Sequence, residues 1–397
     1  MRYNEKTMAQ KYYAGIDVGT HYVKVVVATP PQSADSPMHI LATATSASKG
    51  MRHGYIVDRK EMTHAIHDTV GRAAAAARVA IRSARVAVGG ISLEEIRSSA
   101  DISLTPSGGI VTERDIERSL AESEKRASSR LVNRTVVHTI PLEFRLDGIP
   151  VQGRPFGLQG TKLSVDTLLV TILTQHHDDL VEAVEAAGVE VEGIMAAPLA
   201  ASLVTLNKAQ KTAGVCLANI GAETTSLIVF DNDLPISLKV FPVGSSEVTH
   251  AIALSFQVPL SEAEQLKRGA VTGSSIAPGK MNIVITGRLK ELFGLINTHL
   301  KSIKRDRLLP AGIVITGGGA GLSAAAEVAR ISLKLPSQIG LPAMSARVST
   351  LDATWAVALG LCRWGFAEDR MGRRHSLSDL IGRMTEALRH LFRSLLP

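Results

Sequence analysis

Residues 13–28, YAGIDVGTHYVKVVVA, decide the fold and predict two β-strands joined by a tight turn. Apolar residues flank the turn, and the β-branched run 25–27 suits a buried strand. The turn holds Asp17, Gly19 and Thr20, and Lys24 follows seven residues after the aspartate. A glycine turn can direct backbone N–H groups at an anion, and a carboxylate suits hydrated Mg²⁺. The stretch is therefore a candidate phosphate site, although turns of this kind are also common in ordinary surface hairpins.

Two later stretches resemble this one. Residues 213–230, AGVCLANIGAETTSLIVF, again predict a strand, a small polar turn and a strand. Residues 311–320, AGIVITGGGA, predict a strand that ends in a glycine turn, with a helix from Ser323. Three such turns in this order are more specific than any one of them. They predict an α/β protein with two related lobes that face each other across a cleft.

A different pattern interrupts the first lobe between about Ile91 and Leu169. Short strands there enclose a charged helix over residues 113–128, which Thr112 can cap. The predicted strands are Glu95–Leu104 and Val136–Arg145. The α/β pattern then resumes with a strand at Lys162–Leu173 and a helix that Gly188 ends. The interruption is typical of a small α+β module inserted into a larger domain.

Composition limits the classes of partner. The chain has 397 residues, enough for more than one core, and a net charge of +7 from 44 basic and 37 acidic residues. Aromatic residues are only 4%, which argues against a base-stacking platform, so we expect no nucleic-acid partner. The two cysteines, Cys216 and Cys362, are far apart and favour a reducing cytosol without a cysteine metal site.

The last residues predict a membrane-binding helix. A charged linker over 365–377 precedes a helix over 378–397, which Ser378 or Asp379 can cap. Its apolar residues form one stripe, and its arginines lie on the other face. The stripe includes Leu380, Ile381, Met384, Leu388, Leu391, Phe392 and Leu395, and the arginines are Arg383, Arg389 and Arg393. A basic amphipathic helix after a linker favours an anionic membrane surface, although a terminal helix packed on the protein's own core is an alternative.

The three turns resemble the motifs of the actin–Hsp70–sugar kinase superfamily, and within it the chain resembles the bacterial cell-division family FtsA over nearly its whole length. Residues 15–20 with Lys24 match the first phosphate motif, 219–224 fall on the second, and 315–320 match the adenosine motif. Residues 137–144 and 263–267 match further family segments. The resemblance implies a two-lobed actin-like α/β fold with ribonuclease H-like lobes, an inserted α+β subdomain 1C and a C-terminal amphipathic helix.

That resemblance also implies a division of the chain. Lobe I would comprise subdomain 1A, and lobe II would comprise subdomains 2A and 2B. The expected ranges are 12–88 (1A, first part), 89–170 (1C), 171–210 (1A, second part), 211–244 (2A, first part), 245–305 (2B), 306–350 (2A, second part), 351–364 (terminal helix of lobe I), 365–377 (linker) and 378–397 (membrane helix).

By the same resemblance the cleft would bind ATP with Mg²⁺. Asp17 would hold the metal through water, and Thr20 and Lys24 would contact the β- and γ-phosphates. Gly221 and Thr224 would approach the phosphates from the other lobe. The complete implied set is Asp17, Gly19, Thr20, Lys24, Asn219, Gly221, Thr224, Glu264, Lys267, Gly317, Gly318 and Gly319, of which Glu264 and Lys267 would lie near the ribose and adenine.

Two departures from the superfamily pattern predict slow or absent ATP hydrolysis. The second phosphate motif often has the form DxGGGT, but here the acid is Asn219 and two glycines are Ala222 and Glu223. An amide cannot take a proton, so it orients an attacking water poorly. The helix at 198–206, where actins carry a water-positioning glutamine, has only apolar and small residues plus Ser202. Asp17 and Asn219 are the remaining catalytic candidates, and neither is certain.

The resemblance implies a protein that polymerises and tethers filaments of the tubulin-like division protein FtsZ to the inner face of the cytoplasmic membrane at the division septum. Subdomain 1C would contact the next subunit of a filament, and 2B would bind the FtsZ tail peptide. The basic residues Lys267, Arg268, Lys301, Lys304 and Arg305 would favour an acidic peptide. The alternatives are a pilus-assembly relative, which generally lacks the amphipathic tail, and a sugar or acetate kinase, which needs a catalytic carboxylate.

Overall fold

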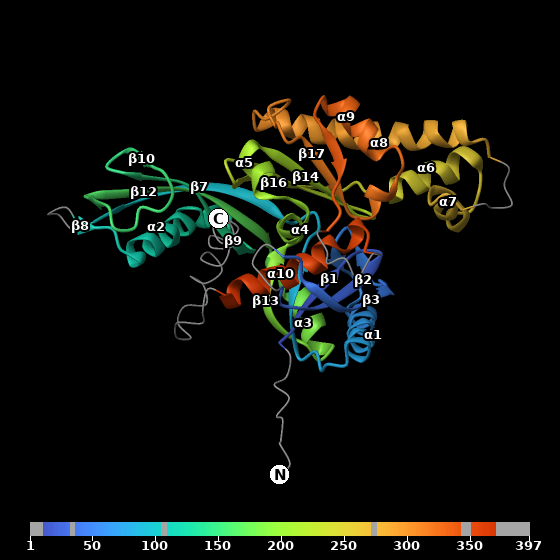
Figure 1. Ribbon diagram of the computed structural model, residues 1–397, viewed down its shortest axis with the longest axis horizontal. Coiled ribbons are helices and arrows are strands. Elements are labelled where there is room, and N and C mark those ends of the chain that lie inside the picture. The colour runs from blue at the N-terminus through green and yellow to red at the C-terminus, as the bar shows by residue number, and fades with distance from the viewer. Residues whose placement is uncertain (1–10, 32–35, 105–108, 271–275, 343–350, 371–397) are drawn as a thin grey trace, which may run out of the picture.

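Two lobes with related sheets form the centre of the molecule (Figure 1). The computed structural model describes residues 11–31, 36–104, 109–270, 276–342 and 351–370. The lobe I sheet has the order β13-β6-β1-β2-β3 and the lobe II sheet has the order β16-β15-β14-β17-β18. In lobe I the strands are β1 (Tyr13–Val18), β2 (Tyr22–Thr29), β3 (His39–Ala47), β6 (Ser83–Val88) and β13 (Glu190–Ala196). In lobe II they are β14 (Val215–Ile220), β15 (Thr225–Asp231), β16 (Leu234–Phe241), β17 (Ile313–Thr316) and β18 (Ser337–Ile339).

The two sheets share one topology. In each, the first three strands form an antiparallel meander, a fourth strand pairs in parallel with the first, and a fifth pairs in parallel with the fourth. Thus β1 pairs antiparallel with β2 and parallel with β6, as β14 does with β15 and β17. The repeated turns predicted two related lobes, and the family resemblance implied that the fold is actin-like; both predictions are confirmed.

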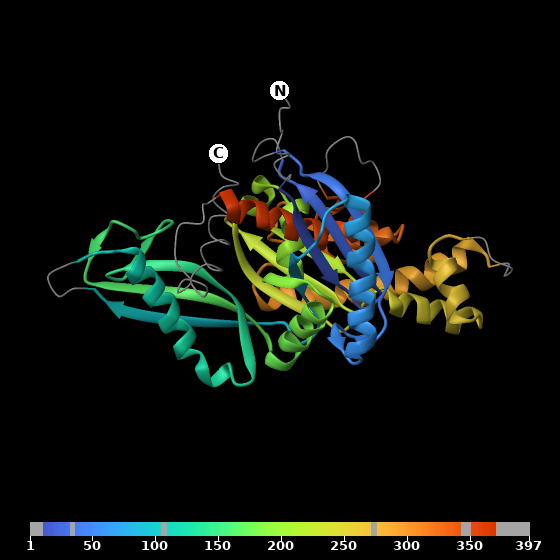
Figure 2. The ribbon, with the colours of Figure 1, turned by 90° about the horizontal axis from the view of Figure 1, so that it is seen from below.

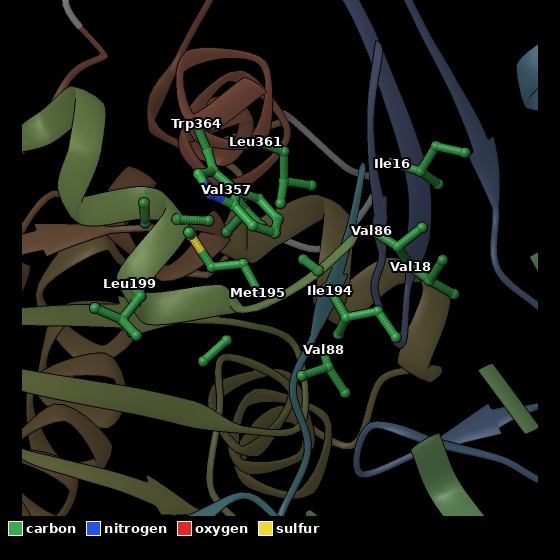
Figure 3. Close-up of a cluster of buried hydrophobic side chains, with 14 of the residues drawn as sticks. Ile16, Val18, Val86, Val88, Ile194, Met195, Leu199, Val357, Leu361 and Trp364 are labelled. Atoms are coloured by element: carbon green, nitrogen blue, oxygen red, sulfur yellow. The ribbon is translucent and has the colours of Figure 1, made fainter. Parts of the chain in front are cut away.

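The lobe I core lies between the lobe I sheet and the helices that pack on it (Figure 3). The helices are α1 (Arg59–Ala77), α3 (Thr174–Ala186), α4 (Ala197–Thr205) and α10 (Ala356–Arg370). Side chains of β1, β6 and β13 meet α4 and α10, and Ile16, Val86 and Trp364 are at most 1% exposed. Burial of such side chains stabilises the fold by roughly 1.5–3 kcal/mol each. Asp58 caps α1 by accepting the Glu61 N–H, which its position before an alanine-rich run predicts.

Lobe II carries the helices α5 (Lys208–Ala213), α6 (Ser246–Phe256), α7 (Leu260–Lys267), α8 (Pro278–Ser302) and α9 (Ala325–Leu333). Leu289, Phe293 and Ile296 of α8 are buried in the lobe II core. Helices α6, α7 and the beginning of α8 project from one end of the molecule (Figure 1). Helix α8 begins at Pro278, and proline is well suited to the first helical turn.

The inserted module projects from the opposite end (Figure 2). Its antiparallel sheet has the order β10-β9-β12-β7, with β7 (Glu94–Ser103), β9 (Arg134–Leu146), β10 (Ile149–Val151) and β12 (Lys162–Leu173). Helix α2 (Glu113–Arg126) covers one face, and Ile116, Phe144 and Leu163 form part of a separate small core. Thr112 and Asp115 form a capping box, so the predicted cap of this helix is confirmed. The pair β8 (Gly109–Ile110) and β11 (Gln159–Gly160) completes the module.

The predicted end of the last core helix was wrong. We expected the helix to end at residue 364 and a linker to begin at Gly365, but α10 continues to Arg370. Its last turns are held by ion pairs, Arg85 with Glu368 at 2.8 Å and Lys11 with Asp369 at 2.7 Å. The remainder of the predicted linker and the predicted membrane helix, 378–397, lie outside the described residues. In the described part of the chain, no helix has the length and apolarity needed to cross a membrane.

Candidate functional site

The turn of lobe I places an acid and a base side by side. Strands β1 and β2 pair in the register Asp17↔Lys24 and Val18↔Val23. Gly19 closes the turn by donating its N–H to the Tyr22 carbonyl at 3.1 Å. A Cβ on Gly19 would lie only 3.0 Å from that oxygen, so a larger residue would strain the turn. The register brings the predicted metal carboxylate and the predicted phosphate cation together at the end of the sheet.

The ionised form of the buried Asp17 carboxylate depends on positive charge nearby. Burial raises the pKa of Asp17, and the positive charge of Lys24 opposes that shift. A metal ion would add positive charge and favour the ionised carboxylate. The described residues contain no group of three metal-ligating side chains. A single carboxylate such as Asp17 suits Mg²⁺, which usually keeps several waters and takes one or two carboxylates with substrate phosphates.

The turn of lobe II repeats this geometry with neutral residues at the two positions equivalent to Asp17 and Lys24. Gly221 donates its N–H to the Thr224 carbonyl at 2.8 Å, and a Cβ on Gly221 would lie 2.9 Å from the same oxygen. The register of β14 and β15 pairs Asn219 with Ser226, where lobe I pairs an acid with a lysine. The two turns are structural equivalents, but only one of them carries charge at these positions.

The glycine turn after β17 packs directly on the second turn. Gly317 has φ +81°, and a Cβ there would lie 2.4 Å from Asn219 Oδ1. A Cβ on Gly319 would lie 2.3 Å from Ile220 Cγ2. Gly318 is exposed, and a Cβ there would meet nothing within 4 Å. Gly317 and Gly319 thus allow close packing within lobe II, and Gly318 leaves open space beside the turn in which a ligand could approach the backbone.

The two predicted adenosine residues belong to one polar network on α6 and α7. Lys267 Nζ lies 2.6 Å from the Glu264 carboxylate, 2.9 Å from Thr249 Oγ1 and 3.2 Å from the Ser245 carbonyl. Burial tends to raise the pKa of Glu264, but hydrogen bonds from Lys267, Thr249 and Arg268 outweigh it and lower this pKa to about 2. Glu264 is therefore an ionised and fixed acceptor at neutral pH.

The segment that joins β16 to α6 was missed by the sequence prediction. Ser245 and Ser246 donate their N–H groups to the carbonyls of Gly221 and Ala222 at 2.9 and 2.8 Å. A Cβ on Gly244 would lie 2.3 Å from the Ala222 carbonyl oxygen. This segment therefore links the second turn to the Lys267 network. A glycine between a strand and a helix, at the third strand of lobe II, was the signal that could have identified it.

Two contacts cross between the lobes beside the turns. Glu223 Oε2 accepts the N–H of His53, 2.6 Å away, in the loop between β4 (Met51–Arg52) and β5 (Tyr55–Ile56). Arg268, at the end of α7, hydrogen-bonds the phenol of Tyr22 in the lobe I turn. These contacts place the turn of lobe II and the end of α7 against lobe I. Glu223 directs its charge at lobe I, where a backbone donor compensates it.

A cavity of about 520 Å³ adjoins this cluster between α6, α8 and the end of β14. Its lining includes Ile220, Gly244, Ser245, Arg288 and Leu322. The volume is within the range of small-molecule sites. None of the predicted nucleotide residues lines it, so it adjoins the predicted phosphate site without containing it.

Helix α4 offers no side chain that could orient water. It is buried, and its hydroxyl-bearing Ser202 is 0% exposed and donates to the Leu199 carbonyl at 2.7 Å. Thr205, at the helix end, donates to the Ala201 carbonyl. Both hydroxyls therefore form hydrogen bonds within the helix.

Sequence comparisons point to one bacterial family. The family described as "Cell division protein FtsA" matches residues 216–360, and the "SHS2 domain inserted in FTSA" matches residues 90–171. The second match coincides with the inserted module. The FtsA of Borreliella burgdorferi is 28% identical over 95% of this chain and 96% of its own length. The FtsA of Pseudomonas aeruginosa is 26% identical, over 93% of this chain and 92% of its own length.

Solved structures support the fold. The "PilM-PilN type IV pilus biogenesis complex" aligns with a TM-score of 0.68 at 21% identity, over 90% of this chain and 99% of that one. MreB5 of Spiroplasma citri bound to ADP aligns with a TM-score of 0.52 at 12% identity, over 88% of this chain and 94% of that one. At these identities the likeness concerns the actin-like fold alone.

Proposed function

Because this chain belongs to the FtsA family of cell-division proteins, we propose that it binds Mg·ATP between its lobes, polymerises, and tethers FtsZ filaments to the inner face of the cytoplasmic membrane at the division septum. One observation carries the nucleotide part of this proposal. The acid–lysine pair Asp17↔Lys24 lies at the end of the lobe I sheet, and lobe II, which contacts lobe I through Glu223 and His53, carries the Gly317 turn and the Glu264–Lys267 network. In the proposed site these groups would form two opposite walls.

Each wall would perform a different task. In lobe I, Asp17 would hold hydrated Mg²⁺, and Thr20 and Lys24 would contact the terminal phosphates. In lobe II, Gly221 and Thr224 would approach the phosphates, and Gly318 would let the nucleotide lie close to the backbone. When bound, Mg²⁺ would neutralise phosphate charge. The fixed Glu264 carboxylate would accept hydrogen bonds from ribose hydroxyls.

The same geometry predicts slow turnover. A general base must lie within hydrogen-bond reach of the proton that it removes, and Asn219 cannot serve as one. Ser202, on α4, uses its hydroxyl internally. The bound nucleotide would therefore act mainly as a clamp between the lobes rather than as a substrate consumed rapidly.

Tethering would depend on the basic amphipathic tail, 378–397. Each basic residue near an anionic leaflet contributes roughly 1 kcal/mol, and the apolar stripe adds the free energy of burial. A single short helix binds weakly, so filament formation would strengthen attachment through multivalency. This couples the proposed polymerisation to the proposed location.

The FtsZ tail peptide would bind the helices of residues 245–305. Leu254, Leu260 and Ile283, from α6, α7 and α8, are 79, 55 and 74% exposed, and so offer apolar contacts. The basic residues predicted for this peptide do not form one patch. Lys267 is paired with Glu264 and Arg305 with Asp231. Lys301 and Lys304 are exposed near the far end of α8, roughly 27 Å along the helix from Ile283. We therefore propose the apolar end of 2B as the peptide site.

Two alternatives remain distinguishable. The structural likeness to PilM keeps a pilus-assembly scaffold as a second candidate, but both family matches and the FtsA relatives favour cell division. A sugar or acetate kinase needs a catalytic carboxylate, and the second phosphate turn has an amide at that position.

Electron microscopy on an anionic lipid monolayer tests the proposed function directly. With Mg·ATP, the full chain should form filaments on the lipid, and a chain truncated after Arg370 should not be retained there. Co-sedimentation with liposomes gives the matched solution measurement. Equal pelleting of the full and truncated chains would refute the membrane role, and absence of filaments under all nucleotide conditions would refute polymerisation.

A further inference from the structure

Strand β16 is the outer strand of the lobe II sheet. It pairs with β15 on one side only, because the sheet order begins at β16. An outer strand presents unpaired N–H and C=O groups along its free edge, and these groups need partners when they are buried. Ser237 and Leu238 of β16 are at most 1% exposed. Groups other than those of a neighbouring strand must therefore form hydrogen bonds with the free edge of β16.

Two side chains of the inserted module satisfy it. The Glu95 carboxylate of β7 accepts the Leu238 N–H at 2.5 Å and the Ser237 hydroxyl at 3.1 Å. Arg97 donates to the Ile236 carbonyl at 2.7 Å. Glu95 and Arg97 are two residues apart on β7, so both side chains lie on one face, and their backbone partners Ile236 and Leu238 are spaced alike. The side chains of β7 thus replace the hydrogen bonds of a neighbouring strand.

The contact extends into the core of lobe II. Ser237 Oγ also lies 2.9 Å from Nε2 of His299, a residue of α8, whose ring meets Phe241 edge-on. Burial raises the pKa of Glu95, although the hydrogen bonds from Leu238 and Ser237 oppose this. The carboxylate is therefore enclosed against β16, and Ser237 links it to His299 of α8.

The same module is joined by the chain to lobe I. Its first strand follows β6 and its last strand leads into α3, both in lobe I. At its beginning, the Ile91 N–H donates to the His53 carbonyl, and a Cβ on Gly54 would lie 2.3 Å from Gly90 Cα. The N–H of this same His53 donates to Glu223 of the lobe II turn. The base of the module therefore lies next to the contact between His53 of lobe I and Glu223 of lobe II.

We propose that the inserted module is a strap between the lobes, which limits how far the lobes rotate relative to each other. The chain joins the module to lobe I, and Glu95 and Arg97 dock it on the free edge of β16 in lobe II. Opening of the cleft must then break the Glu95–Leu238 and Arg97–Ile236 contacts or move the module with lobe II. The consequence for nucleotide release rests on the proposed ATP binding, but the restriction of lobe rotation does not.

Spin labels on the two lobes test the restriction without nucleotide. Both native cysteines are buried, so labels can be placed at His64→Cys on α1 and Lys290→Cys on α8, both exposed. The full chain carrying Glu95→Ala and Arg97→Ala should give a broader and longer distance distribution than the labelled parent. The matched control is Glu122→Ala with Lys125→Ala, on α2 of the same module. Glu122 pairs with Arg126 of its own helix, and this control should leave the distribution unchanged.

A second measurement follows the strap itself. Hydrogen exchange at the Leu238 amide should accelerate in the Glu95→Ala variant and not in the control. If ATP binds as proposed, release of a fluorescent ATP analogue should also accelerate roughly three- to ten-fold, as the loss of about one hydrogen bond's net contribution would produce.

The outcomes separate the strap from the proposed function. Lobe distances and Leu238 exchange that match the parent would overturn the strap, whatever the protein binds. Altered distances together with no binding of the ATP analogue by the parent would support the strap and refute the nucleotide site. If the double variant Glu95→Ala with Arg97→Ala does not fold, Arg97→Ala alone takes its place. This single variant keeps the Glu95 contacts and should still lengthen the distances between the spin labels.

Discussion

The turn of lobe I and the turn of lobe II have the same backbone and different chemistry. In both, a glycine N–H closes the turn on the carbonyl three residues later, Gly19 to Tyr22 and Gly221 to Thr224. In lobe I the cross-strand pair before the turn is Asp17 with Lys24; in lobe II it is Asn219 with Ser226. One sheet ends in an acid and a base, and its equivalent ends in an amide and a hydroxyl.

The difference suggests a division of labour. The lobe I turn, charged at Asp17 and Lys24, would bind metal and phosphate, and the lobe II turn, neutral at the equivalent positions, makes contacts inside the protein. Gly317 packs against the Asn219 side chain, Ser245 donates to the carbonyl of Gly221, and Glu223 reaches across to His53. A turn used for packing and lobe contact can hold a nucleotide in place without the carboxylate that rapid hydrolysis requires. The predictions below test this contrast.

The largest effect is expected from the charged turn. Asp17→Ala or Lys24→Ala should abolish thermal stabilisation by Mg·ATP, because metal or phosphate loses its charged partner. At about 100 times Kd, that stabilisation amounts to about 2.7 kcal/mol. Thermal unfolding with and without Mg·ATP measures it, and the exposed Lys60→Ala on α1 is the control. An Asp17→Ala protein stabilised as strongly as wild type would refute the assignment.

A matched pair of glycines separates packing from ligand approach. Gly317→Ala should reduce the free energy of unfolding by about 1–3 kcal/mol or more, because its φ of +81° is strained for alanine and the Cβ meets Asn219. Gly318→Ala should leave the free energy of unfolding unchanged, since its Cβ meets nothing, but should weaken ATP binding. Urea unfolding and nucleotide titration of both variants measure these effects. Equal stability of the two variants would contradict the packing described for the third turn.

The residues that form these turns could be predicted from the sequence, because a strand, a glycine and a strand are local features. The hairpin at Asp17, the repeated hairpin at Asn219 and the inserted module were all predicted in this way. The end of α10 was not, because its stability is non-local. Gly365 and the charged residues after it are typical of a linker, yet Glu368 and Asp369 pair with Arg85 and Lys11, far away in the sequence.

The direction of side chains also could not be predicted. Glu223 interrupts a glycine-rich motif, and its sequence context does not show that it would meet His53. Glu264 and Lys267 are three residues apart on α7, so their ion pair is local, but Thr249 and Ser245, which complete their network, come from α6 and the residue before it. Only tertiary packing brings these further partners to the pair. The tail helix, 378–397, stays a prediction.

The smallest effect is expected from Glu223. Glu223→Ala should lower the free energy of unfolding by about 1 kcal/mol or less, because the exposed hydrogen bond to the His53 N–H is lost. Glu223→Gln keeps an acceptor and should change it less. Neither substitution should raise ATP hydrolysis, since the side chain serves the contact between the lobes. A substantial increase in hydrolysis in either variant would show instead that Glu223 suppresses catalysis.

The fate of bound ATP tests the central contrast most directly. Wild-type protein and Asn219→Asp are loaded with Mg·ATP, freed of excess nucleotide, and quenched after increasing times to determine the ratio of ADP to ATP. The account predicts that wild type retains mostly ATP and that Asn219→Asp, with a carboxylate restored to the lobe II turn, converts it to ADP faster. Wild-type turnover as fast as that of Asn219→Asp, or wild-type protein that retains no nucleotide, would contradict it.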